Sequence, residues 1–584
     1  MKSSFSFLMF AGTALAFAPD SRKAEEVSLK VKAFQQAPTD GASVNINTFP
    51  EKDLSDIQSR SNTAVIFSGG GSRAYIAALG YLSGLTKLDL MKNIRYIGGT
   101  SGGSWATTTY TYNQNRSLSD IDFLGDILNP EEMTSRNLKH MDEFCARSFT
   151  NTNMMKIALD DMKHNDASQA ESWRTACQQV YLDKIGVVPN SYFSYNQQTV
   201  DDIKARNPSL QNEIFLLPRD SERPYMIIGT SLIGPSSGAP YNCKNSNQNV
   251  TLLDITPLYI GQGKTMIYNY KYADDNTIHD MLVGGGIESY AFYPSGDTNV
   301  SYIQGLSYTQ TTGEIQIPKF DSVFDLGYSI AASSYAPALF EDSLPRGSDW
   351  GGMSFDYFSP ASPDAYVQKT LFGDGGITQN VNLISMLQRN VERIVLFSNG
   401  GIPLQPSSEW DVDIDEPQND QISGWLSSYW GILPTDSKKY EEMGEDYSRN
   451  QVFSKDDWST FVHMLQDAQE TGNGIIATLN MKTIENQWFG IPADQDVELT
   501  VVYLGRLKNW EAKLSPEMKE LFVPHDVDDA ANLSVDIDSG PFKMFPHYAC
   551  TGGFINYERA NALSDLTGWT ILENADLWQK IFSS

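Results

Sequence analysis

Two glycine-rich stretches near the start of the chain could hold negative charge next to a nucleophile. The first, SGGGSR (68–73), follows the short apolar run 64–67 and precedes a helical pattern. A glycine loop between a strand and a helix offers backbone N–H groups to an anion. The second, GTSGG (99–103), follows another apolar run at 94–97 and contains Ser101 in a G-x-S-x-G pattern. At a strand-to-helix elbow of this kind, the serine hydroxyl stands above the edge of the sheet.

The first loop does not fit the common nucleotide-binding patterns. Gly69, Gly71 and Ala74 formally satisfy G-x-G-x-x-G/A, but a dinucleotide site also needs an acidic residue at the end of the second strand. The chain continues there into GGTSGGSW, and no G-K-S/T follows the glycines. The remaining anion is the oxyanion of an ester attacked by Ser101. We therefore expect the N–H groups of Gly70 and Gly71 to form an oxyanion hole.

A serine nucleophile needs a base, and the sequence leaves two candidates open. The order Ser101, Asp374, His547 formally allows a Ser-His-Asp triad, although none of the histidines lies in a recognisable catalytic pattern. Asp374 itself lies in the glycine-flanked turn LFGDGGITQNVNL, where its carboxylate could approach Ser101 directly. Asp-Gly dipeptides are also common in ordinary turns. The six histidines are His140, His164, His279, His463, His525 and His547.

Three sequence blocks resemble, in the right order, the lysophospholipase/phospholipase B and cytosolic phospholipase A family, which is related to patatin. They are SGGGSR (68–73), GTSGGSW (99–105) and GDGGITQNVNLISML (373–387). The segments LLDITPLYIG (252–261) and FPHYACTGG (545–553) are similar to further family segments. The resemblance extends from the strand before the first glycine loop to the C-terminus. Three ordered blocks are far more specific than any one of them.

The resemblance implies an activity and a role for each matching residue. It makes Ser101 the nucleophile and Asp374 its partner in a two-residue dyad, with an acyl-serine intermediate. Gly70 and Gly71 match the oxyanion-hole glycines, and Arg73 matches an arginine that meets the lipid phosphate. The alternative for Arg73 is a salt bridge inside the fold, since buried arginines are usually paired.

The implied function is a phospholipase or lysophospholipase that releases fatty acid at a membrane or micelle surface. Neither a metal nor another cofactor is required by this chemistry, and H-E-x-x-H is absent. Two alternatives stay open. One is a Ser-His-Asp carboxylesterase or a galactolipase of the α/β type. The other is a catalytically inactive lipid-binding or storage protein.

Apolar strands and helical patterns alternate along the chain, which predicts an α/β fold. The resemblance refines this to a patatin-like central sheet with helices on both faces and a cap or lid. We expect residues 61–584 to form the catalytic domain, with 401–450 as an acidic, aromatic-containing excursion. Its stretch GWLSSYWGIL (424–433) would either enter a lipid headgroup layer or pack in the core. Candidate strands are 64–67, 94–97, 225–234, 393–399 and 497–505.

The N-terminus and the charge limit where the chain acts and on what. Residues 1–16 have the order of a secretory signal peptide, ending in an A-x-A site. A secreted or lumenal protein is expected, or one imported into a complex plastid through Phe17-Ala18-Pro19. Residues 17–60 are interpreted as an N-terminal arm. The net charge of −29 argues against nucleic acid as a partner. No apolar run after the signal approaches the ~20 residues of a membrane span.

Overall fold

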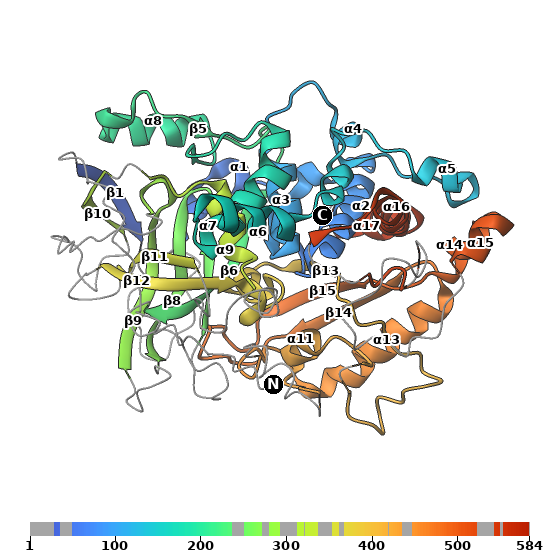
Figure 1. The fold of residues 1–584 in the computed structure, drawn as a ribbon. Coiled ribbons are helices and arrows are strands. Elements are labelled where there is room, and N and C mark those ends of the chain that lie inside the picture. Colours follow the sequence, from blue (N-terminus) through green and yellow to red (C-terminus); the bar gives the residue numbers. More distant parts are fainter. Residues whose placement is uncertain are drawn as a thin grey trace, which may run out of the picture.

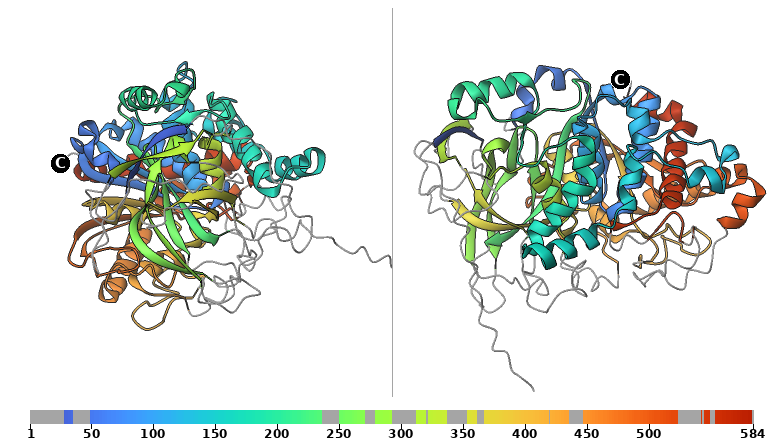
Figure 2. Two further views of the ribbon diagram at one scale, coloured as in Figure 1. Left: turned by 90° about the vertical axis from the view of Figure 1, so that its left-hand side faces the viewer. Right: turned by 45° about the horizontal axis from the view of Figure 1, so that its top comes forward.

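The computed structural model is an α/β protein built on one large mixed sheet (Figures 1 and 2). The predicted signal peptide, 1–16, and Phe17-Ala18-Pro19 lie outside the described residues. The structure describes residues 28–34, 49–235, 250–270, 279–292, 312–319, 322–336, 353–360, 367–418, 420–434, 447–522, 542, 544–548 and 553–582.

The main sheet has a parallel centre and antiparallel flanks. Strands β15, β13, β2, β3 and β6 run parallel, while β14 on one side and β7, β8 and β9 on the other are antiparallel. β12 pairs with the C-terminal half of β6, and β11 pairs with β12. In order across the sheet, the strands are β10 (Thr312–Pro318), β1 (Ser28–Phe34), β9 (His279–Glu288), β8 (Tyr259–Tyr270), β7 (Thr251–Ile255), β6 (Tyr225–Pro235), β3 (Ile94–Thr100), β2 (Ser61–Phe67), β13 (Arg393–Ser398), β15 (Asp496–Tyr503) and β14 (Ile475–Lys482), with β12 (Val367–Asp374) and β11 (Met353–Phe358) off this path.

Helices cover the sheet on both faces, as expected. In Figure 1, α2, α3 and α16 lie on one side of the β13–β15–β14 region, and α11 and α13 lie on the other. The longer helices are α2 (Gly71–Lys87), α3 (Gly102–Tyr112), α6 (Met154–Asn165), α7 (Gln169–Cys177), α8 (Gln197–Arg206), α9 (Leu326–Ser333), α13 (Trp458–Thr471), α16 (Tyr557–Glu573) and α17 (Ala575–Phe582). The shorter ones are α1 (Ser55–Gln58), α4 (Asp120–Leu124), α5 (Ser135–Leu138), α10 (Leu383–Gln388), α11 (Gly424–Ser427), α14 (Lys508–Lys513) and α15 (Pro516–Leu521).

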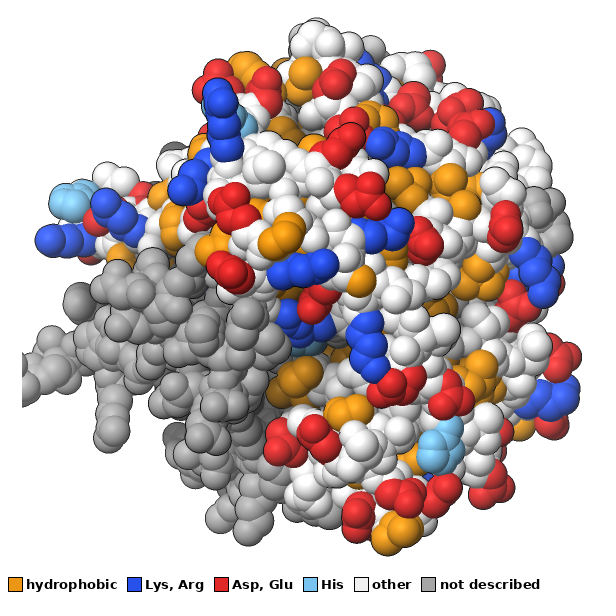
Figure 3. All heavy atoms as spheres, turned by 90° about the vertical axis from the view of Figure 1, so that its right-hand side faces the viewer, with side chains coloured by type: hydrophobic (Ala, Val, Ile, Leu, Met, Phe, Trp, Pro, Cys, Tyr) orange, Lys and Arg blue, Asp and Glu red, His pale blue; other side chains and the backbone are white. Residues whose placement is uncertain are grey.

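The helices next to the central strands are buried on nearly every side. All residues of α3 and most of α2 are buried, which explains why both sequences consist mainly of apolar, aromatic and small residues. No helix in the described ranges is both long and apolar enough to cross a bilayer. On the face shown in Figure 3, acidic and basic side chains are interspersed, so the net negative charge is not gathered into one patch there.

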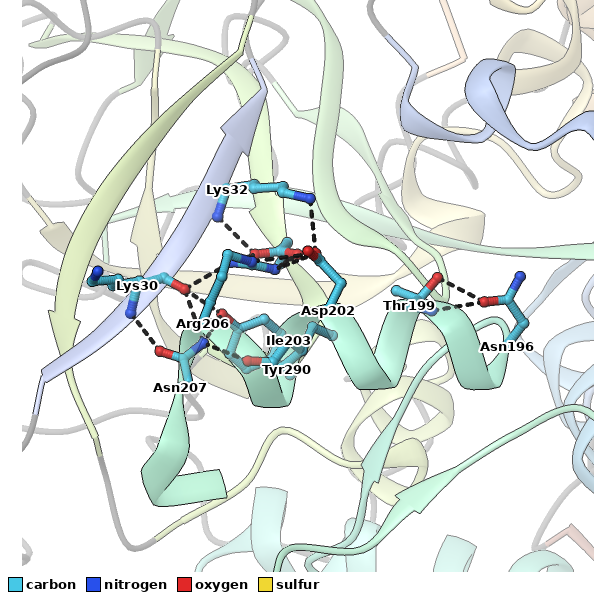
Figure 4. Close-up of polar contacts among 10 residues, drawn as sticks. Lys30, Lys32, Asn196, Thr199, Asp202, Ile203, Arg206, Asn207 and Tyr290 are labelled. Carbon is cyan, nitrogen blue, oxygen red and sulfur yellow. Dashed lines mark hydrogen bonds and ion pairs between the residues drawn. The ribbon is translucent and has the colours of Figure 1, made fainter. Parts of the chain in front are cut away.

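Part of the segment interpreted as an arm is a strand of the sheet. β1 lies between β10 and β9, and side chains from α8 and β9 hold it from the side (Figure 4). Arg206 donates to both carboxylate oxygens of Glu288 and to the carbonyl oxygen of Lys30. Glu288 in turn accepts from the backbone N–H of Lys32 at 2.7 Å. These bonds help to fix the register of β1, an inner strand whose two neighbours lie far away in the sequence.

The aromatic stretch of the excursion packs in the core, so the headgroup-layer interpretation of 424–433 is wrong. Trp425 is 6% exposed, and Tyr429 and Trp430 are fully buried. The ring of Trp430 stacks on Phe461 of α13, with 4.4 Å between the ring centroids. The Tyr429 hydroxyl donates to the carbonyl oxygen of Val381. The other interpretation of this stretch, packing in the core, is confirmed for its aromatic side chains.

Candidate active site

The glycine loop and the elbow lie side by side because their strands are neighbours. β2 and β3 pair in parallel with Phe67 opposite Gly99, so both strands end at the same edge of the sheet. The chain leaves each strand through glycines and enters α2 and α3 respectively. This edge, where the carboxyl ends of parallel strands meet, is the usual position of ligand sites in α/β proteins.

Ser101 has the backbone conformation of a nucleophile elbow. Its φ is 51° and its ψ is −124°, outside the regions favoured by residues with a Cβ atom, and it caps α3. Such a conformation costs about 1–3 kcal/mol and persists only where the surroundings hold it. Glycine is required next to it, because a Cβ on Gly102 would lie 2.1 Å from the carbonyl oxygen of Gly71. The tight turn and the close approach of the two loops therefore depend on each other.

The side chains of Ser101 and Asp374 are in direct contact. The Ser101 hydroxyl donates to Oδ2 of Asp374 at 3.0 Å, and the Gly376 N–H donates to Oδ1 at 2.8 Å. Asp374 reaches this position because β12 pairs with β6, next to β3. Burial raises the pKa of Asp374 to about 6, against the opposing effect of these two hydrogen bonds. A carboxylate with this pKa is ionised at neutral pH and is a better proton acceptor than a free aspartate.

The first glycine loop presents backbone N–H groups close to Ser101. Gly70 and Gly71 have φ values of 135° and 57°, which side chains disfavour. Gly71 is the first residue of α2, so its N–H has no acceptor within the helix. Gly69 donates to the carbonyl oxygen of Asn380, and a Cβ on Gly69 would lie 3.0 Å from the Cβ of Ser101. The loop is thus fixed against the elbow and against the turn that follows Asp374.

Arg73 lies beside the glycine loop and is 7% exposed. Its Nε donates to the carbonyl oxygen of Asn399 at 3.0 Å, and its Nη1 donates to that of Tyr548 at 2.5 Å. A Cβ on Gly70 would lie 2.9 Å from its Nη2. The guanidinium charge is therefore held at a fixed place next to the predicted oxyanion hole.

His547 is not part of a triad in this structure. Its Nδ1 lies 3.2 Å from the carbonyl oxygen of Gly400, and the side chain is buried. Burial, together with the charges of Arg73 and Arg506, lowers the pKa of His547 to about 4, against the opposing effect of the hydrogen bond to Gly400. The hydrogen bonds that the structure gives to the Asp374 carboxylate come from Ser101 and Gly376. Ser101 and Asp374 meet without an imidazole between them.

Sequence reasoning missed two groups that hold the site. The Ser333 hydroxyl at the end of α9 accepts a hydrogen bond from the Ser101 N–H, and the carbonyl of Tyr335 accepts one from the Asp374 N–H. Neither residue belongs to a motif, and the 232 positions between Ser101 and Ser333 leave no local signal. Among the residues that the structure describes, no three His, Cys, Asp or Glu side chains are grouped so that they could hold a metal ion.

Comparison with known proteins agrees with this site. Residues 65–176, which contain the glycine loop and the elbow, match the model of the patatin-like phospholipase family. This part of the chain is thus similar to patatin-like phospholipases. It is 51% identical over 59 residues to cytosolic phospholipase A2 gamma of Mus musculus, an alignment that covers 10% of each chain. It is 22% identical over 390 residues to probable lysophospholipase 2 of Schizosaccharomyces pombe.

These alignments cover only part of each relative. The alignment with the Schizosaccharomyces pombe protein spans 61% of this chain and 54% of that protein. The chain therefore matches about half the length of that relative. Among solved structures, human GIVD cytosolic phospholipase A2 is similar with a TM-score of 0.40 and 11% identity, over 89% of this chain and 60% of that one.

Proposed function

We propose that this protein is a phospholipid acyl hydrolase, a phospholipase or lysophospholipase that uses Ser101 and Asp374 as a catalytic dyad. The observation that carries the proposal is the 3.0 Å hydrogen bond from the Ser101 hydroxyl to Asp374, at the sheet edge where the glycine loop also ends. The patatin-like phospholipase match supports a lipid ester as the substrate class.

The mechanism follows from these positions. The Ser101 oxygen attacks the acyl carbonyl carbon while its proton passes to Oδ2 of Asp374. The N–H groups of Gly70 and Gly71 stabilise the oxyanion, and one such donor is typically worth ~10²–10³ in rate. Asp374 returns the proton to the departing glycerol oxygen, which leaves as the lysolipid or glycerophosphodiester. Water then attacks the acyl carbon and gives a proton to Asp374. The bond from the acyl carbon to the Ser101 oxygen breaks, Asp374 returns the proton to that oxygen, and the fatty acid departs.

Arg73 is proposed as the residue that attracts the phosphate of the lipid. Its guanidinium lies next to Gly70 and is fixed by the carbonyls of Asn399 and Tyr548. A fixed cation at this distance from the glycine loop suits an ester that carries a phosphate a few bonds from the scissile carbonyl. The substrate would be presented at a membrane or micelle surface.

The test is fatty-acid release from phosphatidylcholine and lysophosphatidylcholine by the protein and by Ser101→Ala. We expect release from at least one lipid and its loss in the variant. A monogalactosyl diacylglycerol and a short soluble ester are assayed in parallel. Release from the galactolipid alone would favour a galactolipase, and equal rates on the soluble ester would favour a carboxylesterase. Absence of release from all four substrates would favour the inactive lipid-binding alternative.

A further inference from the structure

The backbone of the nucleophile is held by a side chain from a distant helix. The N–H of Ser101 donates to the Ser333 hydroxyl at 3.0 Å, and Ser333 is the last residue of α9. Both groups are buried. The hydrogen bond thus holds the backbone of Ser101, whose φ of 51° is unfavourable for a residue with a side chain.

The Ser333 hydroxyl has a defined direction. It donates its only proton to the carbonyl oxygen of Gly229 in β6 at 2.6 Å, so a lone pair remains for the Ser101 N–H. Gly229 lies opposite Thr100 in the register of β6 and β3. The hydroxyl therefore joins three elements, the elbow, the neighbouring strand and α9, at one point below the nucleophile.

The same end of α9 also holds the base. The carbonyl oxygen of Tyr335 accepts a hydrogen bond from the Asp374 N–H at 3.0 Å. Thr230 of β6 donates to the carbonyl of Gly373 at 2.7 Å and fixes the strand that carries Asp374. The backbone N–H groups of Ser101 and Asp374 thus both donate to one short segment, 333–335, although the two residues lie 273 positions apart.

We propose that Ser333 is a positioning residue that keeps Ser101 in its reactive backbone conformation. The inference rests on the proposed function of Ser101 as the nucleophile. Because the Ser101 N–H is committed to Ser333, it is not an oxyanion donor, and that role falls to the glycine loop. Loss of the Ser333 hydroxyl leaves a buried N–H without an acceptor, and the elbow relaxes away from Asp374. A displacement of about 1 Å in an active site can cost ~10² in rate.

The test compares four variants at matched expression and folding. Ser333→Ala removes the acceptor, Ser333→Cys keeps the volume with a weak acceptor, and Ser333→Thr keeps the hydroxyl. Ser329→Ala is the matched control. Ser329 lies one turn earlier on α9, is equally buried, and donates only to the carbonyl of Asp325 within the helix.

Three measurements are made on each variant: kcat and KM for fatty-acid release, the rate of covalent labelling by an alkyl fluorophosphonate, and the melting temperature. We expect Ser333→Ala to lower kcat and the labelling rate together by about 10–100-fold with KM nearly unchanged. Ser333→Cys should be impaired, and Ser333→Thr should regain much of the loss. Ser329→Ala should stay close to the unsubstituted protein in kcat while showing a similar change in melting temperature.

Kinetics of Ser333→Ala and Ser333→Cys within twofold of the unsubstituted protein would overturn the inference, as would a loss equal to that of Ser329→Ala. Ser101→Ala separates this result from the proposed function. If Ser101→Ala keeps activity and labelling, the proposed nucleophile is wrong. If Ser101→Ala is inactive while Ser333→Ala and Ser333→Cys are fully active, only the positioning role fails.

Discussion

The protonation state of Asp374 makes the proposed reaction depend on pH. Its carboxylate is partly buried and accepts hydrogen bonds from Ser101 and Gly376, and burial raises its pKa to about 6. A raised pKa means that the folded protein holds this proton more tightly than a free aspartate would. Only the ionised form can accept the proton of Ser101. We therefore expect the proposed dyad to be competent above a pH of about 6 and to be progressively blocked below it.

We predict that kcat/KM falls as the pH drops through about 6, approaching tenfold per unit on the acid side. A histidine would give a similar fall of kcat/KM on the acid side, so two variants are needed to assign this fall to Asp374. His547→Asn should keep both the activity and the limb, because His547 contacts Gly400 rather than the dyad. Asp374→Asn should lose ~10²–10⁴ in kcat. A pH–rate profile that loses its acid limb in His547→Asn would contradict the assignment.

The residues of the candidate site could be named from the sequence, whereas those that support it could not. Ser101, Asp374, Gly70, Gly71 and Arg73 lie in the three blocks that resemble the phospholipase family, and their catalytic roles stay predictions. Ser333 is a serine in an apolar helix, and its role appears only when α9 is packed against the elbow. Long-range side-chain contacts of this kind have no local pattern.

At the scale of elements, the site depends on two loops pressed together at the ends of β2 and β3. The strand candidates 225–234, 393–399 and 497–505 correspond to β6, β13 and β15. The antiparallel half of the sheet was not anticipated, because its partners are distant in sequence: β1, for example, pairs with residues of β10 that lie 278 to 290 positions later. Core packing of Trp430 was one of two interpretations of the sequence, but its stacking partner Phe461 could not be named, because it belongs to another helix.

Gly102→Ala should separate the two loops. The added Cβ would lie 2.1 Å from the backbone oxygen of Gly71, which cannot move without displacing the glycines of the proposed oxyanion hole. We expect a loss of fatty-acid release of at least 100-fold together with a lower melting temperature. Gly505→Ala is the control, because its Cβ would meet the terminal methyl of Ile475, which can rotate away. Equal effects of the two substitutions would show that the close approach is not functionally important.

At the scale of the whole molecule, a buried charge cluster ties the N-terminal segment to the sheet. Arg389 is fully buried and pairs with Glu51 at 2.7 Å and with Asp254 at 2.8 Å, and its guanidinium lies over the ring of Phe49. Residues 49–53 therefore belong to the folded domain. The sequence placed them in an arm because they lack periodic apolar residues, and a buried ion pair cannot be recognised without its distant partner.

Glu51→Gln should lower the free energy of unfolding by about 3–5 kcal/mol, because it leaves the Arg389 charge only partly compensated in the interior. Asp496→Asn, which removes an exposed pair with Lys482, should change the free energy of unfolding far less, because water and salt screen an exposed pair. Urea unfolding of the three proteins measures both values. A change of under 1 kcal/mol in Glu51→Gln would mean that the cluster does not anchor this segment.

The most direct measurement of the central claim is to trap the acyl-enzyme. The protein is mixed with a phospholipid, quenched in acid within one turnover, and digested, and the peptides are weighed by mass spectrometry. The account predicts one peptide heavier by an acyl group minus a proton, with the acyl ester on Ser101, and no such adduct in Ser101→Ala. An acyl group on another residue, or undiminished fatty-acid release by Ser101→Ala, would contradict it.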